Sequence, residues 1–133
     1  MRRALLAVAV GGALGAVLRW SLGLLAPDGQ GFPWTTFAIN VSGSFLLALL
    51  PALPSVRRHR LLPLFLGTGV LGGYTTLSTY AEESRVLFAD GRAGLALAYL
   101  LGTLAACVMA VWLARHLSPP SAQLEFAVEG GEE

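Results

Sequence analysis

The chain has 133 residues, of which 55% are hydrophobic and 13% are charged, and its mean hydropathy is +0.66. Because about a quarter of the residues of a soluble domain are charged, this composition excludes an ordinary soluble domain and indicates a membrane protein surrounded by a lipid bilayer. The formal net charge of +1 gives no reason to expect a nucleic-acid partner, and the single cysteine excludes an internal disulfide.

Four apolar segments each have close to the roughly 20 residues that a helix needs to cross the hydrocarbon core of a bilayer. They cover approximately residues 4–25, 32–53, 61–81 and 94–114, and the third could extend toward Phe88. The sequence therefore predicts an all-α membrane protein with four transmembrane helices in one domain, residues 1–117. Residues 118–133 contain two prolines and four glutamates and predict an acidic, disordered tail.

The arginines are distributed unevenly between the two sides of the predicted helix bundle. Three lie on one side, and six lie on the side of both termini, namely Arg2, Arg3, Arg57, Arg58, Arg60 and Arg115. Positive charge favours the cytoplasmic side, so the bias predicts that both termini are cytoplasmic. The bias is modest, and insertion in both orientations stays open.

The stretch GTGVLGGYTTLSTY, at residues 67–80, is unusual for a transmembrane helix because four glycines precede a cluster of hydroxyl side chains. Glycine costs about 1 kcal/mol relative to alanine in a helix interior. Non-helical backbone at membrane depth survives only where protein buries it or water lines it. We therefore expect the third helix to be broken mid-membrane, with free backbone carbonyl groups that bind an ion.

The first segment carries small residues and one cation. Gly11, Gly12 and Gly15 recur at three- and four-residue spacing, which lets helix backbones approach closely, so we interpret them as packing residues. Arg19 lies beside Trp20 near the end of the segment. It either anchors the helix at the membrane interface or attracts anions toward a pore mouth, and we favour the second interpretation.

Polar side chains follow one face of the second and of the fourth segment, at a spacing of four residues. They are Thr36, Asn40 and Ser44 in the second segment and Tyr99, Thr103 and Cys107 in the fourth. Hydrogen bonds between helices or back to the same helix are structural explanations for Asn40 and Thr103. Because several segments carry such neutral donors, we favour a pathway for a small, hard anion.

The middle of the predicted spans contains no carboxylate side chain and no group of residues typical of a catalytic site. Glu82 and Glu83 follow the third segment, and we interpret them as interfacial. A proton-coupled exporter needs an ionisable group inside the membrane. The sequence shows no Ser/His/Asp set, no phosphate loop and no metal-ligand spacing, so we do not expect an enzyme.

These motifs resemble those of the Fluc (CrcB) family of fluoride channels over roughly residues 5–113. The resemblance is carried by GGALGAVLRW at 11–20, INVSGSF at 39–45 and, most specifically, GTGVLGGYTTLSTYAEE at 67–83. It implies a four-helix subunit that forms an antiparallel, dual-topology dimer with two fluoride pathways and a structural sodium ion at its centre.

The resemblance also implies roles for single residues. Asn40 matches the pore asparagine of the second helix, and Arg19 matches an arginine near the end of the first. Tyr99 and Thr103 match the aromatic and hydroxyl positions of a polar track, which Cys107 would continue with a thiol in place of a hydroxyl. The predicted fluoride pathway also includes Thr36 and Ser44, on the same helix face as Asn40.

Two further positions of the third helix, Gly72 and Thr75, match those whose backbone carbonyls hold the sodium ion in the family. One feature departs from the family pattern. Two phenylalanines with ring edges that face the ion path are replaced here by Leu77 and Tyr80. Tyrosine keeps an aromatic ring, whereas leucine has no positive ring edge to offer an anion.

The function that we expect is therefore a passive, selective fluoride channel in a bacterial-type inner membrane, built as an antiparallel homodimer. The departure at Leu77 keeps open a heterodimeric channel in which this subunit alone is less active. A small dual-topology multidrug exporter is a further alternative, although it would need a glutamate that the first segment lacks. A membrane assembly factor without transport activity would explain the glycines and Asn40, but not a broken helix.

Overall fold

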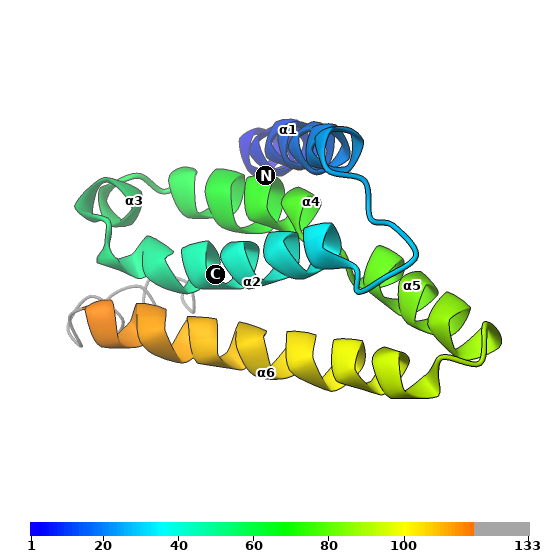
Figure 1. Cartoon of the computed structure of the whole chain (residues 1–133). Coiled ribbons are helices and arrows are strands. Elements are labelled where there is room, and N and C mark those ends of the chain that lie inside the picture. Colours follow the sequence, from blue (N-terminus) through cyan, green and yellow to red (C-terminus); the bar gives the residue numbers. More distant parts are fainter. Residues whose placement is uncertain (119–133) are drawn as a thin grey trace.

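The computed structural model describes residues 1–118, so the predicted acidic tail lies outside the described residues except for Ser118. The described chain is mostly helical and contains no strand (Figure 1). Its elements in order are α1 (Arg2–Leu25), α2 (Trp34–Leu49), η1 (Leu50–Ala52), α3 (Pro54–Arg58), η2 (Leu64–Leu71), α4 (Gly72–Tyr74), α5 (Leu77–Ala89) and α6 (Ala93–Leu117).

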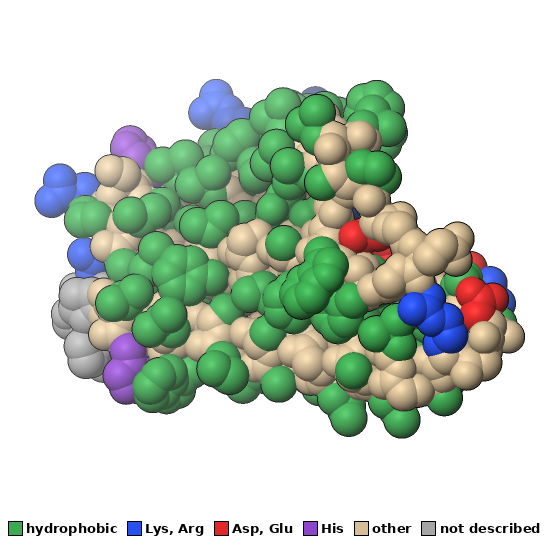
Figure 2. Space-filling view, in the orientation of Figure 1, with side chains coloured by type: hydrophobic (Ala, Val, Ile, Leu, Met, Phe, Trp, Pro, Cys, Tyr) green, Lys and Arg blue, Asp and Glu red, His purple; other side chains and the backbone are tan. Residues whose placement is uncertain are grey.

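Within residues 1–118, three stretches of helix are long and apolar enough to cross a membrane. They are Arg2–Leu25, Trp34–Ala52 and Ala93–Leu117, with mean hydropathies of 1.7, 1.5 and 2.1. Large apolar side chains point outward from them, as Leu14 on α1 and Leu101 on α6 do, and hydrophobic side chains are spread over the face shown in Figure 2. Lipid rather than water suits such a surface, and the predicted helical membrane protein is confirmed to this extent.

The segment from η2 to α5 does not form one regular helix. Its first part, η2, is π-helical, and α4 ends at Tyr74. Thr75 and Thr76 are then extended, with ψ angles of 157° and 119°, before α5 begins at Leu77. The hydroxyl of Thr76 accepts a hydrogen bond from the Thr79 amide at 3.1 Å and so caps the N-terminus of α5. The interruption therefore follows directly after the glycine-rich stretch.

Helix α1 packs directly on the backbone of η2 and α4. A Cβ atom on Gly11 would collide with the Phe65 carbonyl oxygen, and one on Gly15 would collide with that of Val70. These contacts advance along both segments in the same direction, so α1 and η2 run parallel. The interpretation as packing residues is confirmed for Gly11 and Gly15, because only hydrogen fits where backbones approach so closely, whereas a Cβ atom on Gly12 would meet no atom closer than 4.0 Å.

Helices α2 and α6 also run parallel and lie side by side (Figure 1). At one end of this pair, Leu87, Ala96 and Tyr99 form a buried cluster against Phe32 and Phe37. The rings of Phe32 and Tyr99 meet edge to face, with centroids 5.3 Å apart. This cluster fixes α5 and the beginning of α6 against the beginning of α2.

We expect Gly15→Ala to lower the free energy of unfolding by roughly 1–3 kcal/mol, since the new methyl group must displace backbone atoms of η2. The measurement is thermal unfolding of the purified protein in detergent, followed by size-exclusion chromatography. Gly23→Ala is the matched control on the same helix, because a Cβ atom there meets nothing within 4 Å. Equal stability of the two variants would contradict the close packing of α1 on η2.

Candidate functional site

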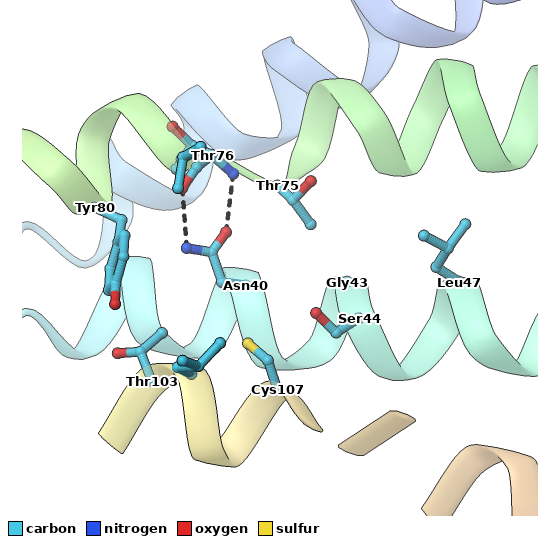
Figure 3. Close-up of a pocket in the computed structure, with 11 residues that line it drawn as sticks. Asn40, Gly43, Ser44, Leu47, Thr75, Thr76, Tyr80, Thr103 and Cys107 are labelled. Atoms are coloured by element: carbon cyan, nitrogen blue, oxygen red, sulfur yellow. Dashed lines mark hydrogen bonds between the residues drawn. The ribbon is translucent and has the colours of Figure 1, made fainter. Parts of the chain in front are cut away.

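A cavity of about 290 Å³ lies between α2, the interruption before α5, and α6 (Figure 3). Neutral side chains and glycine line it entirely. They are Asn40, Gly43, Ser44, Leu47, Thr75, Thr76, Leu77, Tyr80, Thr103, Leu104 and Cys107. Five residues of the predicted pathway thus lie around one space, namely Asn40, Ser44, Leu77, Tyr80 and Thr103.

Asn40 forms two hydrogen bonds with the backbone of Thr76. Its amide nitrogen donates to the Thr76 carbonyl oxygen at 3.0 Å, and the Thr76 amide donates to its side-chain oxygen at 2.8 Å (Figure 3). In an unbroken helix those backbone groups would be bonded within the helix. Asn40 therefore stabilises the interruption and supplies hydrogen-bond partners to the amide and the carbonyl group of Thr76. An amide NH₂ group has two hydrogens, and this arrangement uses one of them.

Thr103 presents a different situation on the opposite wall of the cavity. Its side chain is only 3% exposed, and its hydroxyl has no hydrogen-bond partner among the described residues. A buried hydroxyl without a partner costs about 1–3 kcal/mol, so native structures seldom keep one. The alternative explanation of Thr103, a bond back to its own helix, does not apply, because no such bond is formed. Thr103 lines the cavity, and its buried hydroxyl has a hydrogen left to donate.

Tyr80 contributes its ring and not its hydroxyl. The hydroxyl donates to the Leu100 carbonyl oxygen at 2.7 Å, and the ring lies 5.1 Å from that of Tyr99. The ring edge, which carries partial positive charge, is then the part that can face an anion. Leu77 stands at the open side of the cavity with 78% of its surface exposed.

Two residues of the predicted pathway lie outside this cavity and bind a carboxylate. The hydroxyl of Thr36 donates to Glu83 at 2.9 Å, and that of Tyr99 donates to the other oxygen of Glu83 at 2.7 Å. Thr36 and Tyr99 are 5% and 0% exposed. Glu83 thus ties α5 to both α2 and α6, directly beside the ring pair of Tyr80 and Tyr99.

Arg19 also lies away from the cavity. Its Nε donates to the Gly73 carbonyl oxygen at 3.2 Å, so the guanidinium binds the end of α4 from the side of α1. The described residues contain no group of three or more His, Cys, Asp or Glu side chains that could hold a metal ion. In the third segment, the oxygen atoms that could contact a cation are backbone carbonyls and hydroxyl groups.

The carbonyls of Gly72 and Thr75 have lost their usual helical partners. In a continuous helix they would accept from the amides of Thr76 and Thr79. Those amides donate instead to the Asn40 side chain, at 2.8 Å, and to the Thr76 hydroxyl, at 3.1 Å. These two predicted sodium-binding positions are therefore among the carbonyls that the interruption separates from their helical donors.

The comparisons with known proteins agree with these motifs. A family model described as "CrcB-like protein, Camphor Resistance (CrcB)" matches residues 6–115. The chain belongs to the CrcB family. It is 50% identical over 113 residues to the "Fluoride-specific ion channel FluC 1" of Streptomyces coelicolor, covering 80% of this chain and 71% of that protein.

Two further relatives carry similar names. The chain is 45% identical over 112 residues to "Fluoride-specific ion channel FluC 2" of Nocardia farcinica, covering 82% of this chain and 80% of that one. It is 46% identical over 112 residues to "Fluoride-specific ion channel FluC" of Thermus thermophilus, covering 78% and 85%. The resemblance predicted from the sequence is confirmed.

Sequence reasoning missed Glu83 as a member of the polar network of this CrcB chain. The spacing in the sequence could have indicated this role, because Glu83 follows Tyr80 by three residues and both belong to α5. Side chains three residues apart lie on one helix face. Its neighbour Glu82 is different, since it faces away and pairs with Arg85 at 2.7 Å on the exposed side of α5.

Asn40→Ala should lower the free energy of unfolding by roughly 2–4 kcal/mol, because both backbone groups of Thr76 would lose their partner. Ser44→Ala, one turn further along α2 on the same cavity wall, is the matched control and should change stability by less than about 0.5 kcal/mol. Thermal unfolding in detergent measures both. If the Asn40 variant is as stable as the Ser44 variant, Asn40 does not hold the interruption.

Proposed function

We propose that this chain is the subunit of a passive, selective fluoride channel that releases cytoplasmic fluoride through a bacterial-type inner membrane. The observation that carries the proposal is the buried, unpartnered Thr103 hydroxyl in a cavity lined only by neutral groups. Relatives named as fluoride-specific ion channels support it. An anion that is strongly hydrated in water needs such donors to replace the water that it loses in a channel. A catalytic reaction or an exchange of protons would need other groups instead, such as an ionisable side chain.

In the proposed mechanism, fluoride exchanges water for fixed donors along the cavity. Thr103 and Ser44 offer hydroxyl hydrogens, Asn40 offers its second amide hydrogen, and Tyr80 offers a ring edge. Fluoride, the smaller and harder anion, forms shorter hydrogen bonds to these donors than the larger chloride ion does, so the donors favour fluoride. No energy source is required, because the membrane potential drives an anion outward by about 2.3 kcal/mol per charge for each 100 mV.

The proposed architecture has four spans, with η2, α4 and α5 forming a third span broken at Thr75 and Thr76. Two pairs of parallel neighbours support this arrangement, α1 with η2 and α2 with α6. If α2 and α6 both cross the membrane in the same direction, the chain between them must cross once in the opposite direction. The extended residues are protected by Asn40 and α1, as backbone at membrane depth requires.

The proposed assembly is an antiparallel homodimer with two pathways. The exposed Leu77 beside the cavity is compatible with it, because a second subunit packed against this residue would close the open side of the cavity. The same residue supports the second candidate, a heterodimer whose other subunit supplies an aromatic ring there. In that case this chain alone would conduct weakly.

A structural sodium ion between the two subunits is also part of the proposal. The carbonyl oxygens of Gly72 and Thr75, released by the interruption, are hard donors suited to a hard cation. Two-fold symmetry would bring two such pairs to one ion. Broken helices in membrane proteins supply carbonyls to cations in this way.

We expect liposomes that contain only this protein to release fluoride rapidly once valinomycin makes them permeable to potassium, and to retain chloride. Thr103→Val should reduce fluoride efflux by about 10- to 100-fold, the range for a lost hydrogen bond to a charged group. It should leave thermal stability unchanged or slightly higher, since an unpaired hydroxyl disappears. Thr68→Val, at an exposed position of η2 outside the cavity, is the control for both measurements.

The two readouts separate the possible results. Lower efflux from a Thr103 variant of undiminished stability supports a permeation role. Equal efflux from both threonine variants would contradict it. If the folded, dimeric wild-type protein itself releases no fluoride, the homodimeric channel is wrong. Co-reconstitution with a second CrcB subunit then tests the heterodimer.

Replacing sodium by N-methyl-D-glucamine at constant ionic strength should lower the thermal stability of the purified dimer. For a sodium concentration 100 times the dissociation constant, the lost stabilisation is about 2.7 kcal/mol. Lithium and potassium serve as size controls and should restore less stability than sodium. An unfolding temperature that is independent of the cation would contradict a sodium ion held by these carbonyls.

A further inference from the structure

A second cavity, of about 580 Å³, lies at the end of the molecule where α1 and η2 begin. Its lining combines two nitrogen-bearing side chains with apolar ones. The residues are Ala7 of α1 and His59, Arg60, Leu61, Leu62 and Phe65 from the segment that leads into η2. The proposed fluoride pathway uses none of them.

The surroundings of this cavity are strongly basic. Arg2, Arg3, Arg57 and Arg58 belong to the same end, on α1 and α3. Arg3 precedes Ala7 by one helical turn, so it lies on the helix face that borders the cavity. In the part of the chain that the structure describes, the four acidic residues lie in the connection after α1 and between residues 82 and 90, toward the opposite end (Figures 1 and 2).

The apolar part of the lining continues into the outer surface of the predicted membrane helices. Leu61 is 40% exposed at the cavity, and Leu6 and Val10 of α1 are 63% and 54% exposed nearby along the chain. A ligand that matches this lining carries negative charge beside His59 and Arg60 and hydrocarbon beside Ala7 and Phe65. A free phosphate ion satisfies only the first requirement.

We propose that this cavity binds an anionic phospholipid. The phosphate group lies against Arg60, His59 and Arg3, and an acyl chain lies along Ala7, Leu62 and Phe65. Basic pockets between helices on the cytoplasmic side of membrane proteins suit anionic headgroups, because that leaflet carries the anionic lipids. In the proposed antiparallel dimer, one of the two copies of this site faces the cytoplasmic leaflet.

Native mass spectrometry of the full-length protein in detergent tests the proposal, with phosphatidylglycerol and phosphatidylcholine of identical acyl chains as probes. Wild-type protein should retain phosphatidylglycerol at least 10-fold more tightly. The double variant Arg3→Gln/Arg60→Gln should lose most of this preference, about fivefold for each arginine. Arg85→Gln/Arg92→Gln, with the same change of charge at the other end, should keep it.

A second pair of variants probes the acyl chain without changing charge. Ala7→Trp should weaken retention of phosphatidylglycerol by blocking the apolar wall, whereas Ala9→Trp, at an exposed position of α1, should not. If the arginine double variant does not fold, this pair of variants still tests whether the cavity binds the lipid. Equal affinity for both lipids, equal losses in the two arginine variants, or full competition by inorganic phosphate at equal concentration would overturn the proposal.

Discussion

The paired hydrogen bonds between Asn40 and the backbone of Thr76 are the interaction on which the rest of this structure depends. An interruption in a helix leaves backbone donors and acceptors without their helical partners, and each such group costs several kcal/mol when it is kept from water. One carboxamide supplies both a donor and an acceptor at the required place. It thereby permits the turn that brings Leu77 and Tyr80 to the cavity and releases the carbonyls of Gly72 and Thr75.

The same arrangement explains why an apparently costly sequence is retained. The glycines that weaken the third segment as a helix allow α1 to press against its backbone, and Arg19 closes the contact by binding the Gly73 carbonyl. The glycines make the third segment less stable as a helix, but they allow the tertiary contact with α1 on one side of it. On its other side, Asn40 binds the backbone of the interruption. The interruption is thus held between two neighbouring helices, which makes it a fixed part of the fold.

Much of the fold and about half of the candidate site follow from sequence patterns, for identifiable reasons. Hydropathy gives the long helices, and four-residue spacing shows that Asn40 and Ser44 share a face. Spacing does not show which partner a side chain meets. Thr36 and Tyr99 lie on the predicted faces, yet they bind Glu83 instead of lining the cavity, because α5 continues far enough to turn that carboxylate inward. Whether Thr103 bonds to its own helix was equally undecidable from spacing alone.

Cys107 lines the cavity one turn beyond Thr103, and it is the only cysteine in the chain. A thiol differs in reactivity from every other side chain of the protein. A spectroscopic label can therefore be attached at the cavity wall of the natural sequence without first replacing other cysteines. The chain carries its own unique attachment point at the position from which occupancy of the cavity is most directly observed.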